Sequence, residues 1–248
     1  MMFDLDPYAP INVLKPVADD LWIVDGPVIR MKWLWTSLPF STRMTVVRLG
    51  DGGLWVHSPT DITPSLKAEI DALGPVRFLV APNRIHYWWL RDWQLSYPQA
   101  LSFAPPGVEE NARKRGAAFD YVLGASPVAE WSGEIDHVVV SGQFMAEADF
   151  FHKASRTLVL TDLIENFEPE KLHGRLWRFI CRLGGVLDPH GSMPRDMRAT
   201  FVGSRSELKR AVETMIGWGP ARIIVTHGRC YERDAEAELR RAFAWVGV

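Results

Sequence analysis

Short runs of β-branched and aromatic residues recur along the first half of the chain and predict strands. Such runs occupy residues 21–24, 43–49, 53–57 and 78–80. The turn Gly50-Asp-Gly-Gly53 between two of them predicts a hairpin. Thr63 followed by Pro64 predicts the N-cap and first turn of a helix that ends near Gly74. An aromatic, helix-like segment follows over about 85–95.

The second half of the chain repeats this alternation. Strands are predicted at 137–140, 148–152, 157–160 and 222–226, and helices at 109–118, after the capping box Ser204-Arg-Ser-Glu207, and after Asp234. Two halves that are each rich in strands and end in a strand and a helix favour two sheets packed face to face with helices outside. We therefore expect a single α/β domain over residues 1–248.

Three of the predicted strands lead to a residue that can bind a metal ion. The segments 157–162 and 222–228 carry Asp162 and His227 just after their β-branched runs, and the segment 76–86 ends on His86. Imidazole and carboxylate groups are common ligands of divalent metals. We predict that these three side chains converge on one site.

The order of elements, with these residues at strand ends, resembles the metallo-β-lactamase superfamily and its four-layer αββα sandwich. More narrowly, the chain is similar to an uncharacterised family of such proteins, a domain of unknown function (DUF4336). The segments that carry the resemblance are 39–49, 54–59, 81–86, 155–166 and 225–228. The resemblance implies the fold over nearly the whole chain, and it implies no particular activity.

The chain departs from the superfamily's signature, His-x-His-x-Asp-His. The corresponding segment reads Ala81-Pro-Asn-Arg-Ile-His86, so only the last histidine remains. A further family ligand, a histidine after a glycine, is replaced by Gln143. The resemblance therefore implies that the first metal site is lost. The second site keeps His86, the bridging aspartate as Asp162, and the final histidine as His227.

Two imidazoles and one carboxylate can hold a single zinc, iron or manganese ion with open positions. Asn83 or Gln143 could add a weak amide ligand. With such an ion the protein would hydrolyse a small ester, lactone or phosphoester, with Asp162 and His227 as catalytic residues and Asp162 as the orienting base. The alternative is a metal-free, non-catalytic descendant of the fold that binds a small molecule or a protein partner, with the tryptophan-rich segments around Trp33 and Trp88 as its binding surface.

Composition and charge bear on the expected partners and cellular compartment. A net charge of -2 gives no reason to expect nucleic acid as a partner. Two cysteines and the absence of a secretory pattern in the first ten residues predict a reduced, cytoplasmic protein. The segment 169–183 predicts a basic amphipathic helix with Leu172, Leu176, Phe179 and Leu183 on its apolar side. Such a helix could lie on an anionic membrane, but we expect it to cover a core and do not expect membrane binding.

Other residues whose side chains could take part in binding or catalysis are interpreted as structural. We expect His152 to pack in its hairpin, His57-Ser-Pro59 to form a turn near the pocket floor, and Cys230 to be a buried thiol. Arg43 and Arg156 could clamp an anionic substrate, but ion pairing is the expected use. The glycine- and proline-rich loop 184–194 is a candidate for a mobile flap over the pocket.

Overall fold

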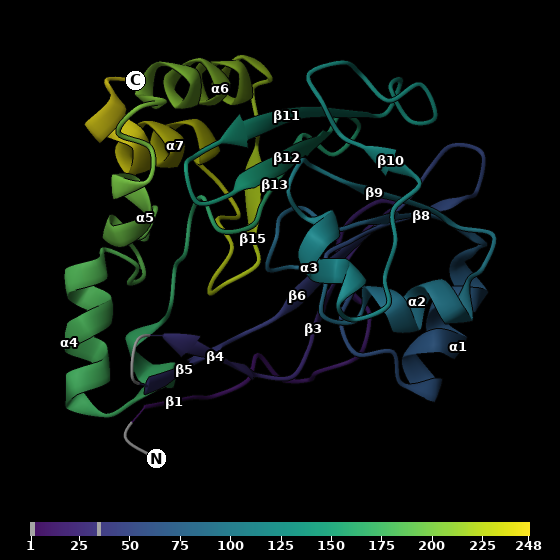
Figure 1. Ribbon diagram of the computed structural model, residues 1–248, viewed down its shortest axis with the longest axis horizontal. Helices are drawn as coiled ribbons and strands as arrows, with labels where there is room; N and C mark the ends of the chain where they lie inside the picture. The colour runs from purple at the N-terminus through teal and green to yellow at the C-terminus, as the bar shows by residue number, and fades with distance from the viewer. Residues whose placement is uncertain (1–2, 34–35) are drawn as a thin grey trace.

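A computed structural model of the protein describes residues 3–33 and 36–248 (Figure 1). Trp35, and the side chain of Trp33, lie outside the described residues. Two sheets pack face to face, and helices cover the outer face of each (Figure 1). The structure therefore confirms the predicted α/β sandwich.

The first sheet is built from the N-terminal half of the chain. Its strand order is β10 (Tyr121–Val122), β9 (Leu101–Ala104), β8 (Val76–Val80), β7 (Leu54–His57), β6 (Arg43–Arg48), β3 (Leu21–Asp25) and β2 (Lys15–Ala18). The predicted hairpin joins β6 to β7, which pair antiparallel, whereas β8 runs parallel to both of its neighbours. The segment after β8 therefore emerges at the carboxyl edge of a parallel strand.

The second sheet comes from the C-terminal half. Its order is β11 (Ile135–Ser141), β12 (Ala146–His152), β13 (Thr157–Leu160) and β15 (Arg222–Val225). The parallel pairing of β13 with β15 places Leu160 opposite Val225 at the end of both strands. Two smaller pairs complete the strands: β1 (Asp4–Leu5) with β14 (Leu172–His173), and β4 (Ile29–Trp33) with β5 (Thr36–Phe40).

The helices form the outer layers and one edge of the molecule (Figure 1). Their bounds are α1 (Pro64–Leu73), α2 (Leu90–Ser96), α3 (Glu109–Arg113), α4 (Arg175–Gly184), α5 (Arg195–Ala199), α6 (Arg205–Gly217) and α7 (Ala235–Phe243), with short 3-10 turns at Pro169–Lys171 and Ala244–Val246. The first three pack on the first sheet, and α6 and α7 pack on the second. No helix within the described residues has the length and apolar character needed to cross a bilayer.

The core between the sheets is made by alternate residues of each strand. In β7, Trp55 faces the second sheet while Val56 faces the outer helices. In β12, Phe150 faces the first sheet while Phe151 faces α6 and α7. The Trp55 and Phe150 rings meet edge to face with centroids 4.9 Å apart. Because side chains alternate along each strand, one set packs between the sheets and the other packs under the helices.

Several predicted helix boundaries need correction. The α1 start is as predicted, because the Thr63 hydroxyl accepts a hydrogen bond from the Leu66 backbone N–H. The aromatic segment becomes helical only at Leu90, after a turn that carries His86, and α3 ends at Arg113. Ser204 begins α6 without a side-chain cap, so the predicted capping box does not form. The helix predicted over 169–183 starts at Arg175, since the chain first pairs with β1.

Arg43 ties the two sheets together below the strand ends. Its guanidinium pairs with the buried carboxylate of Asp25 at 2.8 Å and donates to the carbonyl oxygens of Val225 and Gly228. Arg156 likewise serves structure, because it donates to the carbonyl of Gly219. The expected ion pairing is therefore observed for Arg43, whereas Arg156 is held by a hydrogen bond to a backbone carbonyl instead.

We expect Arg43→Met to lower the free energy of unfolding by about 3 kcal/mol, because it leaves two carbonyls without this donor and leaves buried Asp25 with Lys15 as its ion-pair partner. The matched change Arg156→Met, at an exposed hydrogen bond, should cost less than about 1 kcal/mol. Urea denaturation of both variants measures the difference. Equal losses would show that Arg43 is not the link between the sheets.

Candidate metal centre

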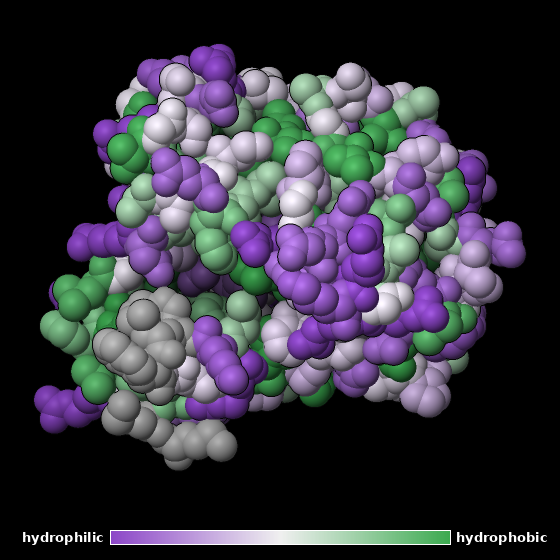
Figure 2. All heavy atoms as spheres, viewed as in Figure 1, coloured by the Kyte–Doolittle hydropathy of each residue, from purple (hydrophilic) through white to green (hydrophobic). Residues whose placement is uncertain are grey.

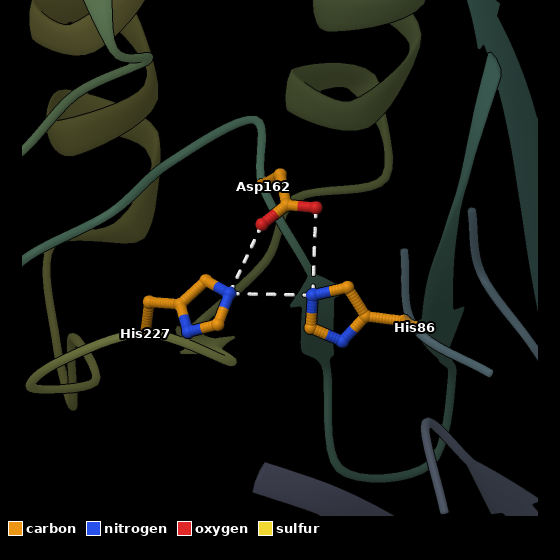
Figure 3. Close-up of side chains that lie close together, drawn as sticks. All are labelled: His86, Asp162 and His227. Carbon is orange, nitrogen blue, oxygen red and sulfur yellow. Dashed lines mark hydrogen bonds and ion pairs between the residues drawn. The ribbon is translucent and has the colours of Figure 1, made fainter. Parts of the chain in front are cut away.

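The predicted triad is brought together by the ends of three strands (Figure 3). Asp162 and His227 each lie two residues beyond the paired ends of β13 and β15, so the parallel register places them side by side. His86 lies in the turn after β8, where its backbone N–H donates to the Asn83 carbonyl and side-chain oxygens. Two sheets therefore contribute to one site at the carboxyl edge of the sandwich.

The facing atoms of the triad are close and evenly spaced. The Nε2 atom of His227 lies 3.0 Å from Oδ1 of Asp162 and 3.2 Å from Nε2 of His86, and the latter lies 3.4 Å from Oδ2 of Asp162 (Figure 3). Two nitrogen or oxygen ligands on a tetrahedral zinc ion are about 3.3 Å apart, given bonds of about 2.0 Å. The separations are close to this value, with a different oxygen of Asp162 nearest to each imidazole, and they are compatible with ligation of one ion.

Hydrogen bonds to the far side of each ring orient the two imidazoles. Nδ1 of His227 lies 2.8 Å from the Ser41 carbonyl oxygen, which can only accept, so this nitrogen carries the proton. Nδ1 of His86 lies 2.9 Å from the Ser58 hydroxyl. A neutral His227 therefore turns a lone pair toward the Asp162 carboxylate. This arrangement calls for either an extra proton or a cation among the three side chains.

Asp162 is held by its backbone and its side chain. The carboxylate of Glu147 accepts hydrogen bonds from the backbone N–H groups of Thr161, Asp162 and Leu163, which fixes the turn after β13. The Asn83 amide donates to Oδ2 of Asp162 at 2.6 Å. Burial opposes ionisation of Asp162, but His86 and His227 outweigh it and hold the pKa of this carboxyl well below its usual range. The Asp162 side chain is therefore an anionic carboxylate.

Asn83 and Gln143 do not extend the ligand set. The Asn83 amide nitrogen donates to both Asp162 and Glu147, and its oxygen accepts from the backbone N–H groups of Ile85 and His86. Both ends of this amide are occupied by the protein. Gln143 is exposed, and its backbone N–H donates to the Thr200 carbonyl beside α5. The structure therefore does not support the weak amide ligand that the sequence allowed at either residue.

A pocket adjoins the two imidazoles. Ser58, Pro59 and Thr42 line one part of it. Of the turn predicted over 57–59, Ser58 and Pro59 lie at the pocket, whereas His57 is the last residue of β7 and does not line it. The remaining wall is largely apolar and is formed by Ile29, Met31, Ile85, Trp88 and Trp89. No lysine or arginine is among the described residues that line this pocket. The lining favours a neutral, apolar group beside the triad.

Three buried acids near the triad, Glu147, Asp149 and Glu165, were not predicted from the sequence. Glu147 is the second residue of β12, and Asp149 lies two residues further along the same strand, so the two side chains share a face. Burial raises the pKa of Glu165 to about 8, with His227 lowering it and Asp162 raising it. Glu165 lies three residues after Asp162 and is 7% exposed. The burial of these acids close to a candidate ligand could not be predicted from sequence patterns alone.

The structural roles expected for other residues are mostly observed. His152 is buried in its hairpin, with Nδ1 2.8 Å from the Ser155 hydroxyl. Cys230 is half-buried and lies 3.2 Å from the Arg43 guanidinium, and it does not line the pocket. The loop 184–194 is hydrogen-bonded along the 165–167 segment and also lies outside the pocket wall. Its packing does not support the predicted flap.

Comparison with known proteins agrees with the observed fold. The model of a family described as "Domain of unknown function (DUF4336)" matches residues 36–172. No curated protein is detectably similar in sequence. Among solved structures, the metallo-β-lactamase FIM-1 from Pseudomonas aeruginosa, in its mono-zinc form, superposes with a TM-score of 0.59 and 12% identity, over 99% of this chain and 98% of its own.

Two further structures show the same similarity. A metallo-β-lactamase from Hirschia baltica matches with a TM-score of 0.58 and 14% identity, over 94% of this chain and 96% of its own. A metal-soaked flavodiiron core, Flv1 from Synechocystis sp. PCC6803, matches with a TM-score of 0.61 and 12% identity, over 99% of this chain and 61% of its own. At such low identity these matches establish the metallo-β-lactamase fold alone.

The raised pKa of Glu165 makes a prediction about stability. Its carboxyl releases a proton near pH 4.5 when unfolded and near pH 8 when folded, so the free energy of unfolding should fall as pH rises through this window. Glu165→Gln removes this dependence, and the variant should gain stability relative to the wild type by at most about 1.4 kcal/mol per pH unit. Urea denaturation across the window, with exposed Glu110→Gln as control, tests this. A constant difference between Glu165→Gln and wild type would contradict it.

Proposed function

The chain belongs to the family described as a domain of unknown function (DUF4336), and from its site we propose that it is a hydrolase with one divalent metal ion. His86, Asp162 and His227 would hold the ion. The spacing of 3.0 to 3.4 Å between their facing atoms is the observation that carries this proposal. The donor set of two imidazoles and one carboxylate suits zinc, iron or manganese.

Residues around the triad would each have a separate role in such a site. An ion held there supplies Lewis acidity that lowers the pKa of water and polarises a carbonyl group. Ser41 fixes the tautomer of His227 through its carbonyl oxygen. Asn83 and the turn held by Glu147 fix the orientation of Asp162, which would orient water beside the ion through a hydrogen bond. The burial of Asp162 excludes bulk solvent from its carboxylate.

The pocket lining indicates the class of substrate. A phosphoester would bring negative charge to a wall that, in its described part, carries no lysine or arginine. An acyl chain or a lactone ring would instead contact Met31, Trp88 and Trp89. We therefore favour a neutral carboxylic ester or lactone with an apolar acyl part over a phosphoester.

We expect the zinc- or manganese-loaded protein to hydrolyse p-nitrophenyl acyl esters, and KM to fall as the acyl chain lengthens. Hydrolysis of p-nitrophenyl phosphate should be much weaker, because the described part of the pocket wall carries no lysine or arginine. His227→Ala should lower kcat/KM by more than about 100-fold, because loss of a ligand exceeds the 10- to 100-fold effect of losing a ligand's partner. His190→Ala, at an exposed histidine outside the pocket, serves as the matched control.

An esterase activity that is unchanged in His227→Ala would contradict the proposal. A preference for the phosphate ester would leave the metal site in place but overturn the proposed substrate class.

A second candidate function is a metal-free binding protein that uses the same pocket. The observation in its favour is that Asn83 and Glu147 satisfy one another and Asp162 with hydrogen bonds, where the superfamily's signature has metal ligands. An extra proton on His227 would complete such a cluster without an ion. Under this alternative the pocket binds an apolar ligand and performs no chemistry.

Thermal unfolding with and without a chelator separates the two candidates. If the metal site is real, EDTA lowers the Tm of the purified protein and one particular divalent ion restores it, because an ion that binds only the folded state stabilises it. The double variant His86→Ala/His227→Ala should show neither effect. A Tm that is unchanged by EDTA and by added ions would favour the metal-free alternative.

A further inference from the structure

The helix α4 presents its apolar stripe to solvent. Leu176, Phe179 and Leu183 are 50%, 56% and 52% exposed, whereas Trp177 and Cys181 on the opposite side are buried. The expectation that this stripe covers a core is therefore wrong. Leu172, which was grouped with the stripe, is buried in β14. Large apolar side chains that are adjacent and exposed commonly mark an interaction surface.

Positive charge runs along one flank of this stripe. Arg175, Arg178 and Arg182 are exposed, and none of them forms an ion pair within residues 3–33 and 36–248. Arg175 and Arg182 lie four residues before and three residues after Phe179, so they flank it on the helix surface. The chain as a whole has a net charge of -2, so this cationic flank is a local feature.

The buried side of α4 belongs to the same cluster as the strands beside the pocket. Trp177 and Cys181 pack with Leu38 of β5 and with Phe167. The Phe167 ring in turn stacks on the His227 ring, with centroids 6.2 Å apart. The helix is therefore firmly packed on one side only, and its other side is free to contact a partner without loss of the core.

We propose that α4 docks this protein on the surface of an anionic lipid bilayer. Leu176, Phe179 and Leu183 enter the boundary between headgroups and acyl chains, and the three arginines contact the acidic headgroups. The helix lies at the outer edge of the molecule (Figure 1), and Figure 2 shows hydrophobic side chains over this edge with hydrophilic ones beside them. This proposal does not rest on the hydrolase proposed above.

A second copy of the chain fits this surface less well. In a two-fold symmetric dimer through the stripe, the arginine flank of one protomer would face the same flank of the other, which costs free energy by like-charge repulsion. An anionic bilayer offers both an apolar layer and negative charge, and it complements the two sides of α4 together. The charge pattern therefore favours lipid over self-association.

The test is co-sedimentation of the full chain with vesicles of equal parts phosphatidylcholine and phosphatidylserine. We expect binding that weakens with added salt and is far weaker on phosphatidylcholine alone. Leu176→Ser/Phe179→Ser/Leu183→Ser should abolish it. Arg175→Gln/Arg182→Gln should weaken it about 25-fold, at about fivefold for each basic side chain. Since all these side chains are exposed, the variants should keep the wild-type Tm.

Matched controls change exposed side chains elsewhere: Leu95→Ser/Val202→Ser for the apolar stripe and Arg210→Gln/Arg233→Gln for the arginines. These should bind vesicles like the wild type. Failure of the wild type to bind the acidic vesicles would overturn the proposal, and so would a folded stripe variant that still binds. A dimer that the stripe variant dissociates, in the absence of vesicle binding, would identify a second copy as the occupant instead.

Discussion

The candidate site depends on the parallel pairing of β13 with β15, because this register brings the segments that carry Asp162 and His227 side by side. Two further contacts use that placement: Glu147 holds the turn that carries Asp162, and the Ser41 carbonyl oxygen fixes the ring of His227. The result is a close set of nitrogen and oxygen atoms that face one another at 3.0 to 3.4 Å. The lone pair of His227 and the Asp162 carboxylate are both acceptors, so their contact calls for a proton or a cation between them.

The segment that stands in place of the superfamily's signature is held by hydrogen bonds within the protein. Asn83 donates to both Asp162 and Glu147, so hydrogen bonds now join groups at a place where the superfamily's signature brings metal ligands. A buried carboxylate with several backbone N–H donors is a strong support for a turn. The remaining triad is therefore rigid, with an apolar pocket on its open side, and these are properties that a mononuclear hydrolase requires.

The sequence could predict the sandwich and the triad because both follow from strand periodicity and from residues at strand ends. His86, Asp162 and His227 come together as expected. The roles of Asn83 and Glu147 could not be predicted, because they depend on which amide and carboxylate atoms meet across the two sheets. The exposure of Leu176, Phe179 and Leu183 was also missed, since an amphipathic pattern does not say which of two apolar faces meets the core.

The central claim is that the triad binds one divalent ion, and elemental analysis of the purified, untagged protein tests it most directly. We predict close to one zinc, iron or manganese ion per chain, and loss of that ion in the double variant His86→Ala/His227→Ala. No stoichiometric metal after incubation with each of these ions, or the same metal content in the double variant, would contradict the account.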